Sequence, residues 1–112
     1  MPEKFDEETT RIIQQMQLAE QNLQNLLLQK QTFQLESSET EAALDELKEA
    51  KGDVYKIVGG IMLKASKQQL EKELKRKHEL LELRIKAIEK QERALQDQLA
   101  KTREEVMKKI SA

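Results

Sequence analysis

The sequence has little of the material from which a compact enzyme core is built. Its 112 residues include no cysteine and no tryptophan, and only three residues are aromatic. The absence of cysteine excludes disulfides and thiolate metal ligands. The shortage of bulky side chains disfavours an ordinary globular core, and no catalytic motif is recognisable. We therefore expect no enzyme activity, no catalytic residues, no cofactor and no metal site.

Long apolar runs are also missing. No run approaches the roughly 20 residues that a membrane span needs, and residues 1–8 lack the basic and apolar regions of a signal peptide. Charged residues make up 37% of the chain, but the net charge is only -1. Nucleic-acid binders normally carry a clear positive surplus. We expect a cytoplasmic protein with neither a membrane nor a nucleic acid as partner, and we interpret the basic stretch 72–78 as a solvated helix face.

The few helix breakers divide the chain into two arms. Pro2 is the only proline, and the three glycines all lie between residues 52 and 60. Residues 1–50 hold 11 acidic and 4 basic residues, whereas residues 67–112 hold 9 acidic and 13 basic residues. Opposite charges on the arms favour a chain that folds back on itself over parallel pairing of like arms.

Each arm carries a heptad pattern, with seam positions spaced alternately three and four residues apart. The seam of the first arm is Phe5, Thr9, Ile12, Met16, Ala19, Leu23, Leu26, Lys30, Phe33, Ser37, Thr40, Leu44 and Leu47. The seam of the second arm is Leu74, His78, Leu81, Ile85, Ile88, Glu92, Leu95, Leu99, Thr102 and Val106, with Ile110 one residue beyond the repeat. Two matching seams predict a coiled coil.

An antiparallel register with opposing residue numbers that sum to 118 makes the two seams compatible. Large apolar residues then oppose each other, as in the pair Leu44 and Leu74. Thr40 comes opposite His78, and Lys30 lies one layer from Glu92. Polar seam residues commonly fix the alignment of a coiled coil at some cost in stability. We interpret Lys30 and Glu92 as register markers, and the lone His78 as a packing residue rather than a metal ligand.

Between the arms, β-branched and aromatic residues replace the Gln, Glu and Leu of the helices. The segment 52–66 is typical of a strand, a turn and a second strand, with Gly59-Gly60 as a two-residue type I′ or II′ turn and Ser66 as the cap of the next helix. The glycine pair has none of the further spacing of a phosphate-binding loop. A two-stranded ribbon is marginal in water, and this one is apolar on both faces, so we expect it to pair with other hairpins. The predicted assembly residues are Val54, Tyr55, Ile57, Val58, Ile61, Met62 and Leu63.

Apolar residues also accumulate near the two chain ends, which an antiparallel fold brings together. Ile13 adjoins the seam residue Ile12, and Met107 adjoins Val106. These residues would form either ordinary end packing or a soft surface for unfolded client proteins, and the sequence leaves both interpretations open. The predicted client-binding residues are Phe5, Ile12, Ile13, Met16, Val106, Met107 and Ile110. A second off-seam set has no identifiable partner: Leu27, Leu28, Leu35, Leu80 and Leu83.

The segment Asp53-Val-Tyr-Lys-Ile-Val-Gly-Gly-Ile-Met-Leu-Lys64, followed by Leu-Arg-Ile-Lys at 83–86 and Glu-Lys-Gln-Glu at 89–92, resembles the β-class subunit of archaeal-type prefoldin. The resemblance covers nearly the whole chain, and its single hairpin indicates the β class rather than the α class. It departs from the family in having Gly59-Gly60 where Gly-Asn is typical. It implies one mainly α domain over 1–112, a long antiparallel two-helix coiled coil with a central β-hairpin that joins an oligomeric β-barrel. Helices are expected at about 4–50 and 67–111, around a hairpin linker at 51–66.

The resemblance further implies a function and partners. The chain would be a subunit of an ATP-independent chaperone, or holdase, which captures unfolded proteins at its coiled-coil tips and hands them to a group II chaperonin. Its partners would be α-type subunits and further copies of itself, in a heterohexamer of two α and four β chains. The alternative is a structural coiled-coil tether or spacer that dimerises through its hairpin. A spacer does not require a ribbon that is apolar on both faces, whereas an assembly of several chains does. The hairpin therefore favours the chaperone subunit over the spacer.

Overall fold

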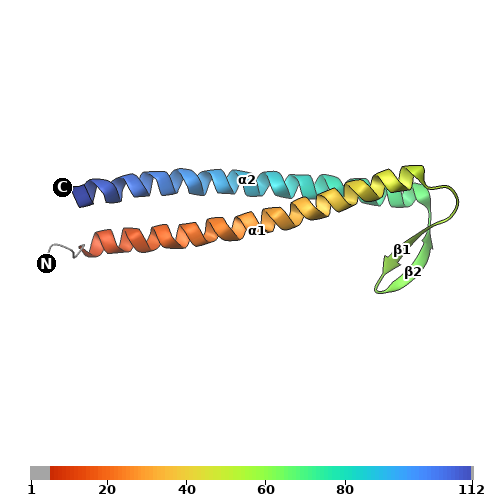
Figure 1. Cartoon of the computed structure of the whole chain (residues 1–112), viewed down its shortest axis with the longest axis horizontal. Helices are drawn as coiled ribbons and strands as arrows, with labels where there is room; N and C mark the ends of the chain where they lie inside the picture. The colour runs from red at the N-terminus through yellow and green to blue at the C-terminus, as the bar shows by residue number, and fades with distance from the viewer. Residues whose placement is uncertain (1–5, 112) are drawn as a thin grey trace. The chain divides into compact units, whose positions relative to one another are not determined.

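The computed structural model describes residues 6–111, which form two long helices joined by a β-hairpin (Figure 1). Helix α1 is Glu7–Glu49 and helix α2 is Lys67–Ser111. Strand β1 is Val54–Val58 and strand β2 is Ile61–Ala65. The observed elements confirm the expected fold class of a mainly α chain with one central hairpin, and α1 begins three residues later than expected.

Local hydrogen bonds set the helix starts. The Asp6 carboxylate accepts a hydrogen bond from the Thr9 backbone N–H at 2.6 Å, which satisfies one of the free amides in the first turn of α1. Ser66 Oγ accepts from the Gln69 N–H at 3.4 Å, so Ser66 caps α2 as expected, although the bond is long. Each helix therefore begins directly after a polar residue whose side chain replaces the missing intrahelical partner.

The chain divides into two compact units, and the helices run antiparallel in each. Unit 1 is formed by Met1–Lys30 with Ala87–Ala112, and unit 2 by Gln31–Lys86. In unit 1, Lys109 pairs with Glu8 at 3.1 Å, Arg103 with Glu20 at 3.7 Å, and Lys30 with Glu92 at 2.7 Å. As the residue number rises on α1, that of its partner on α2 falls. These pairs lie close to the register inferred from the sequence.

Unit 2 has the same antiparallel arrangement. The Arg84 guanidinium carbon lies 5.6 Å from the centre of the Phe33 ring, within the range of a cation–π contact. Further along, Lys67 Nζ donates a hydrogen bond to the Ala50 carbonyl at 3.0 Å. This bond occupies a carbonyl just beyond the end of α1, where no intrahelical donor is present. It ties the start of α2 to the end of α1 at the base of the hairpin.

The burial pattern confirms both seams. Every predicted seam position from Thr9 to Leu47 in α1 and from Leu74 to Val106 in α2 is buried or half-buried, whereas Ile110 is exposed. The most buried apolar side chains are Leu47, Leu81, Ile85, Ile88, Leu99 and Val106. Apolar burial of this kind stabilises the pair of helices by about 25 cal/mol for each Å² removed from water. The core of each unit is thus the seam between its two helix segments.

The hairpin is a two-stranded antiparallel sheet closed by Gly59 and Gly60. The register pairs Val54 with Ala65 at one end and Val58 with Ile61 at the other. Gly59 has φ +57° and Gly60 has φ +79°. Positive φ at both central positions defines a type I′ turn, because a type II′ turn has it only at the first. The turn therefore favours glycine at both positions through its backbone conformation and not through crowding, since nothing lies within 4 Å of a Cβ built on either one.

Candidate assembly and client-binding surfaces

The hairpin exposes apolar side chains on both of its faces. Cross-strand partners share a face, so one face carries the Val58–Ile61 and Lys56–Leu63 pairs and the other carries the Ile57–Met62 pair. The large apolar side chains of the hairpin are between 46% and 71% exposed: Tyr55, Ile57, Val58, Ile61, Met62 and Leu63. Val54, the remaining predicted assembly residue, is half-buried at the base. This much apolar area on a slender ribbon is typical of an interaction surface.

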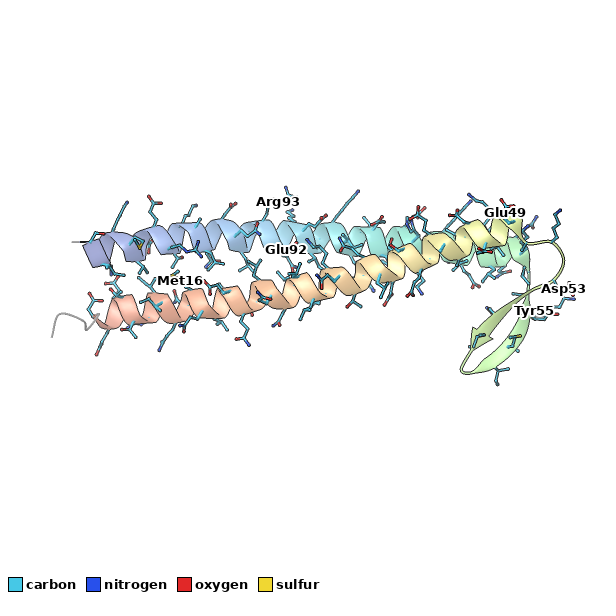
Figure 2. The ribbon with its side chains drawn as sticks, viewed as in Figure 1. Met16, Glu49, Asp53, Tyr55, Glu92 and Arg93 are labelled. Atoms are coloured by element: carbon cyan, nitrogen blue, oxygen red, sulfur yellow. The ribbon has the colours of Figure 1, made fainter. Side chains whose placement is uncertain are left out.

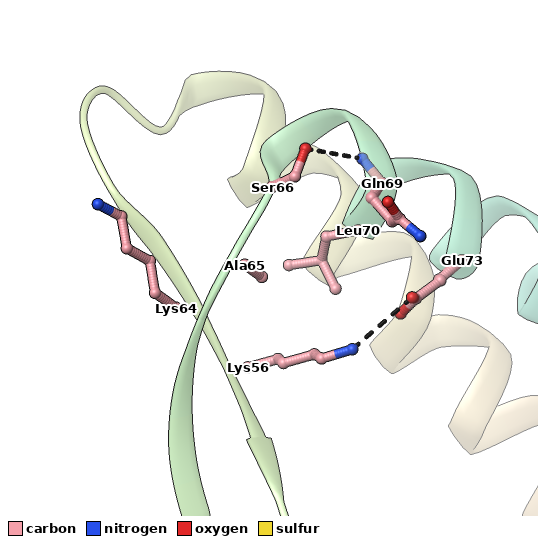
Figure 3. A pocket seen from close by; sticks show the side chains of 7 residues that line it. All are labelled: Lys56, Lys64, Ala65, Ser66, Gln69, Leu70 and Glu73. Atoms are coloured by element: carbon pink, nitrogen blue, oxygen red, sulfur yellow. Dashed lines mark hydrogen bonds and ion pairs between the residues drawn. The ribbon is translucent and has the colours of Figure 1, made fainter.

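Polar contacts hold the base of the hairpin against α2 (Figure 3). Lys56 Nζ lies 3.7 Å from Glu73 Oε1, and Figure 3 shows this pair beside Leu70 and the Ser66 cap. Lys64 points away from α2 in the same view, and its Nζ lies 3.5 Å from Asp53 Oδ1. Both pairs are largely solvated, so each contributes less than about 1 kcal/mol. Of the two, only the Lys56–Glu73 pair joins the hairpin to α2, and neither covers the apolar surface of the hairpin.

A hollow of about 400 Å³ lies between the base of the hairpin and the two helices of unit 2. Sequence reasoning missed this hollow, because residues from three elements form it. One residue in the sequence could have indicated the hollow: Leu70 stands four residues before Leu74 and extends the apolar face of α2 beyond the strict heptad. The residues that line the hollow are Ala43, Glu46, Leu47, Ala50, Val54, Tyr55, Leu70 and Leu74.

Six of the seven predicted client-binding residues lie at the end of unit 1 where α1 begins and α2 ends. The seventh, Phe5, lies outside the described residues. Val106 is only 7% exposed, because it packs in the seam, and Ile12, Ile13 and Met16 are half-buried. Met107 and Ile110 are 58% and 51% exposed. Only the last two therefore present most of their side chains to a ligand in this conformation.

The register markers form a polar layer within the seam of unit 1. Lys30 Nζ donates to Glu92 Oε1 at 2.7 Å, and the two side chains are only 19% and 12% exposed. Figure 2 shows Glu92 on the side of α2 that faces α1 and its neighbour Arg93 on the opposite side. A short charge-assisted hydrogen bond with little solvent around it is the geometry in which such a pair fixes alignment.

His78 is half-buried on the seam of unit 2, as predicted. Within residues 6–111, its Nε2 is a buried side-chain atom with no hydrogen-bond partner, and the nearest carboxylate oxygen, on Glu82, is 3.9 Å away. Thr40, which we expected opposite His78, donates its hydroxyl to the Glu36 carbonyl at 2.7 Å. Across the same range, no group of three or more His, Cys, Asp or Glu side chains is arranged to hold a metal ion.

Other exposed leucines lie on the outer surfaces of the helices. The off-seam set noted in the sequence, Leu27, Leu28, Leu35, Leu80 and Leu83, is exposed throughout. Leu18 is also 60% exposed and was missed, since it belongs neither to the seam nor to this set. Single exposed apolar residues are common on protein surfaces. Neither helix, over its described length, contains a stretch apolar enough to cross a membrane.

Two long antiparallel helices with an apolar hairpin between them define a class of coiled-coil assembly subunits, and comparisons with known proteins identify the family. A family model described as "Prefoldin subunit" matches residues 10–112. A prefoldin subunit beta from Pyrobaculum islandicum is 40% identical over 91 residues, which cover 80% of this chain and 73% of that protein. One from Thermococcus kodakarensis is 42% identical over 87 residues, which cover 76% and 74%.

Structural similarity agrees with these matches. The crystal structure of the prefoldin beta subunit from Thermococcus strain KS-1 superposes with a TM-score of 0.89 and 32% sequence identity, covering 97% of each chain. The chain belongs to the prefoldin family, as a subunit of its β class. It is therefore a chaperone subunit of a family that forms hetero-oligomers with other prefoldin subunits, and that family is one of chaperones rather than enzymes.

Proposed function

We propose that this chain is a subunit of an ATP-independent holdase that captures unfolded proteins and passes them to a group II chaperonin in the cytoplasm. The observation that carries the proposal is the hairpin, whose six large apolar side chains are all at least 46% exposed. Burying these side chains against other chains supplies the energy for assembly, since each fully buried side chain contributes about 1.5–3 kcal/mol. The comparisons support the chaperone role.

The assembly that we propose is a heterohexamer of two α-type and four β-type chains, joined through their hairpins into a β-barrel. An isolated pair of strands is marginal in water. Both outer edges of the hairpin also carry unpaired backbone groups, because each of its strands has one neighbour. Pairing with further strands satisfies these groups and covers both apolar faces at once. The predicted assembly residues thus act together as one interface.

Client capture is assigned to the exposed side chains at the end of unit 1, chiefly Met107 and Ile110. Methionine adapts to irregular apolar partners because its side chain is unbranched and polarizable. A single pair of side chains binds weakly. Several copies in one assembly bind an unfolded chain much more tightly, because each further contact is intramolecular. Weak individual contacts also permit release without ATP.

The experiment assembles the chain with its α-type partner and measures suppression of aggregation of a chemically denatured client enzyme. We expect the wild-type assembly to suppress light scattering in the absence of ATP. Val58→Asp places a charge on the hairpin face and is expected to disperse the assembly and abolish suppression. Lys51→Ser, an exposed change outside the strands, is the matched control and should leave both intact. Assembly without suppression would contradict the holdase function.

A further inference from the structure

The hollow at the base of the hairpin is bounded by mostly apolar side chains. All of its lining residues belong to unit 2, and all but one are apolar or, in Tyr55, aromatic. The exception is Glu46. Small-molecule sites of this size, about 300–1,000 Å³, combine apolar walls with several convergent polar groups. A hollow with one carboxylate among otherwise apolar walls fits a protein side chain better than a metabolite.

The hollow is continuous with the apolar surface of the hairpin. Val54 and Tyr55 line it and are also the first residues of β1. On the face that carries Ile57, Tyr55 lies two positions along the same strand, so a chain that covers this face also reaches the hollow. This continuity indicates that the occupant comes from the same assembly that buries the hairpin.

We propose that the hollow receives the Ile57–Met62 pair from the hairpin of a second copy of this chain. The proposal rests on the proposed function, because it requires several β-type chains in one assembly. Ile57 and Met62 are direct cross-strand partners and are the two most exposed apolar side chains of the hairpin, at 71% and 65%. They therefore gain most from burial and stand next to each other, as two side chains entering one hollow must.

Charge complementarity supports the same occupant. Lys64 lies two positions from Met62 on the same strand, so both side chains project from the same face. Its side chain is 68% exposed and pairs only loosely with Asp53, at 3.5 Å. When Met62 enters the hollow of a neighbour, we expect Lys64 to pair with Glu46, the one charged residue that lines it. Because the two contacting surfaces differ, the contact is heterologous.

Two adjacent alanines give a matched test. Ala42 and Ala43 are both exposed residues of α1, but only Ala43 lines the hollow. Ala43→Phe fills the hollow and is expected to weaken assembly by about tenfold or more, as overpacking does. Ala42→Phe should assemble as the wild type does. Helix content of each unassembled variant, measured by circular dichroism, shows that both fold. Equal assembly by the two variants would overturn the proposal.

Cross-linking tests the occupant directly, since the chain contains no native cysteine. Chains carrying Ala43→Cys and chains carrying Met62→Cys are mixed, assembled with a cysteine-free α-type chain, and treated with a short bifunctional thiol reagent. We expect a product that joins one chain of each kind. The Ala42→Cys and Met62→Cys mixture should give only background.

The outcomes separate this proposal from the proposed function. A hexamer that forms without the cross-linked product overturns the occupancy of the hollow and leaves the chaperone assembly standing. A further mixture combines the Ala43→Cys chain with an α-type chain that carries one cysteine in its hairpin. A cross-link between these two chains would assign the hollow to the other subunit class and overturn the proposal. Failure of the wild-type chains to form any hexamer contradicts both.

Discussion

Lys30 and Glu92 lie 62 residues apart in the sequence, yet their side chains join across the two helices of unit 1 at 2.7 Å. They are the only oppositely charged residues at seam positions, and each is less than one-fifth exposed. A pair in this setting opposes any slip of the helices, because a slip would leave both charges in an apolar layer without a partner. We therefore expect this pair to contribute to alignment more than to stability.

Removing one partner tests the pair. Lys30→Leu leaves the Glu92 carboxylate partly buried and unpaired, so we expect a loss of about 1–3 kcal/mol in the free energy of unfolding. Arg103→Leu breaks the exposed pair with Glu20 at 3.7 Å and should cost less than about 1 kcal/mol. Chemical denaturation of both variants measures the difference. Similar losses in the two variants would remove the special role of Lys30.

The double variant Lys30→Leu with Glu92→Leu separates stability from alignment. An apolar layer in place of the ion pair should raise the melting temperature, while alternative registers or oligomers become populated. Thermal unfolding followed by circular dichroism gives the first quantity, and native mass gives the second. A double variant with an unchanged melting temperature and a single unchanged species would refute the assignment of these residues as register markers.

The turn glycines differ in what they tolerate. Gly59→Asn should be nearly neutral, because asparagine adopts the left-handed conformation that φ +57° requires more readily than other residues do. Gly60→Val places a β-branched side chain at φ +79° and should destabilise the hairpin by about 1–2 kcal/mol or more. Both positions have open space around a Cβ, so the difference in stability between the two variants reports backbone strain and not crowding. Denaturation of the assembled complex compares them, and equal midpoints would argue against a type I′ turn.

Asp6 makes the start of α1 sensitive to acid. Hydrogen bonds from the Thr9 side chain and then the Thr9 backbone amide lower the pKa of Asp6 below its ordinary value of 3.8, with a smaller contribution from the charge of Lys109. The capping contribution is therefore complete at pH values above 3.8 and is lost as the pH falls through the lowered folded-state pKa. An NMR titration of the Thr9 amide should show this midpoint.

Asp6→Asn is the matched control for that titration, because asparagine caps a helix about equally well but does not ionise. In this variant the Thr9 amide should show no transition with a midpoint below 3.8, and the first turn should keep its protection from hydrogen exchange. Asp6→Ala should lose that protection at neutral pH. A midpoint at or above 3.8 in the wild type would contradict the role of Asp6 as a cap.

Met107 and Ile110 test client capture without disturbing the seam. Replacing both with Ser removes exposed apolar surface, so assembly and melting temperature should stay close to those of the wild type while suppression of client aggregation falls. Val106→Ser provides the contrast: Val106 is buried, and its replacement should lower the melting temperature. Undiminished suppression by the Met107→Ser, Ile110→Ser variant would count against capture at this surface.

The seams and the hairpin could be predicted from local pattern, because heptad spacing and a Gly-Gly turn between β-branched runs depend on neighbours in sequence. The Lys30–Glu92 pair followed from extending the register along both arms. The same pattern places Val106 in the seam, where it is 7% exposed, whereas Met107, the next residue along the helix, is 58% exposed. The pattern does not show which of the two residues contacts a client, so their client-binding roles stay predictions.

Features that combine several elements lay beyond the sequence pattern. The hollow forms where the end of α1, the start of β1 and the start of α2 meet, and no residue spacing within one element predicts it. The hydrogen bond from Lys67 to the Ala50 carbonyl depends on the same convergence. Glu46 and Ala43 carried no signal of their own, since charged and small residues are common on exposed helix surfaces.

The native mass of this chain, measured alone and then with an α-type prefoldin chain from the same source, tests the central claim most directly. In the proposed assembly, both apolar faces of the hairpin are covered by other hairpins. The account predicts a discrete hexamer of two α-type and four β-type chains when the two are mixed. A chain that stays a monomer or dimer and does not bind the α-type chain would contradict it.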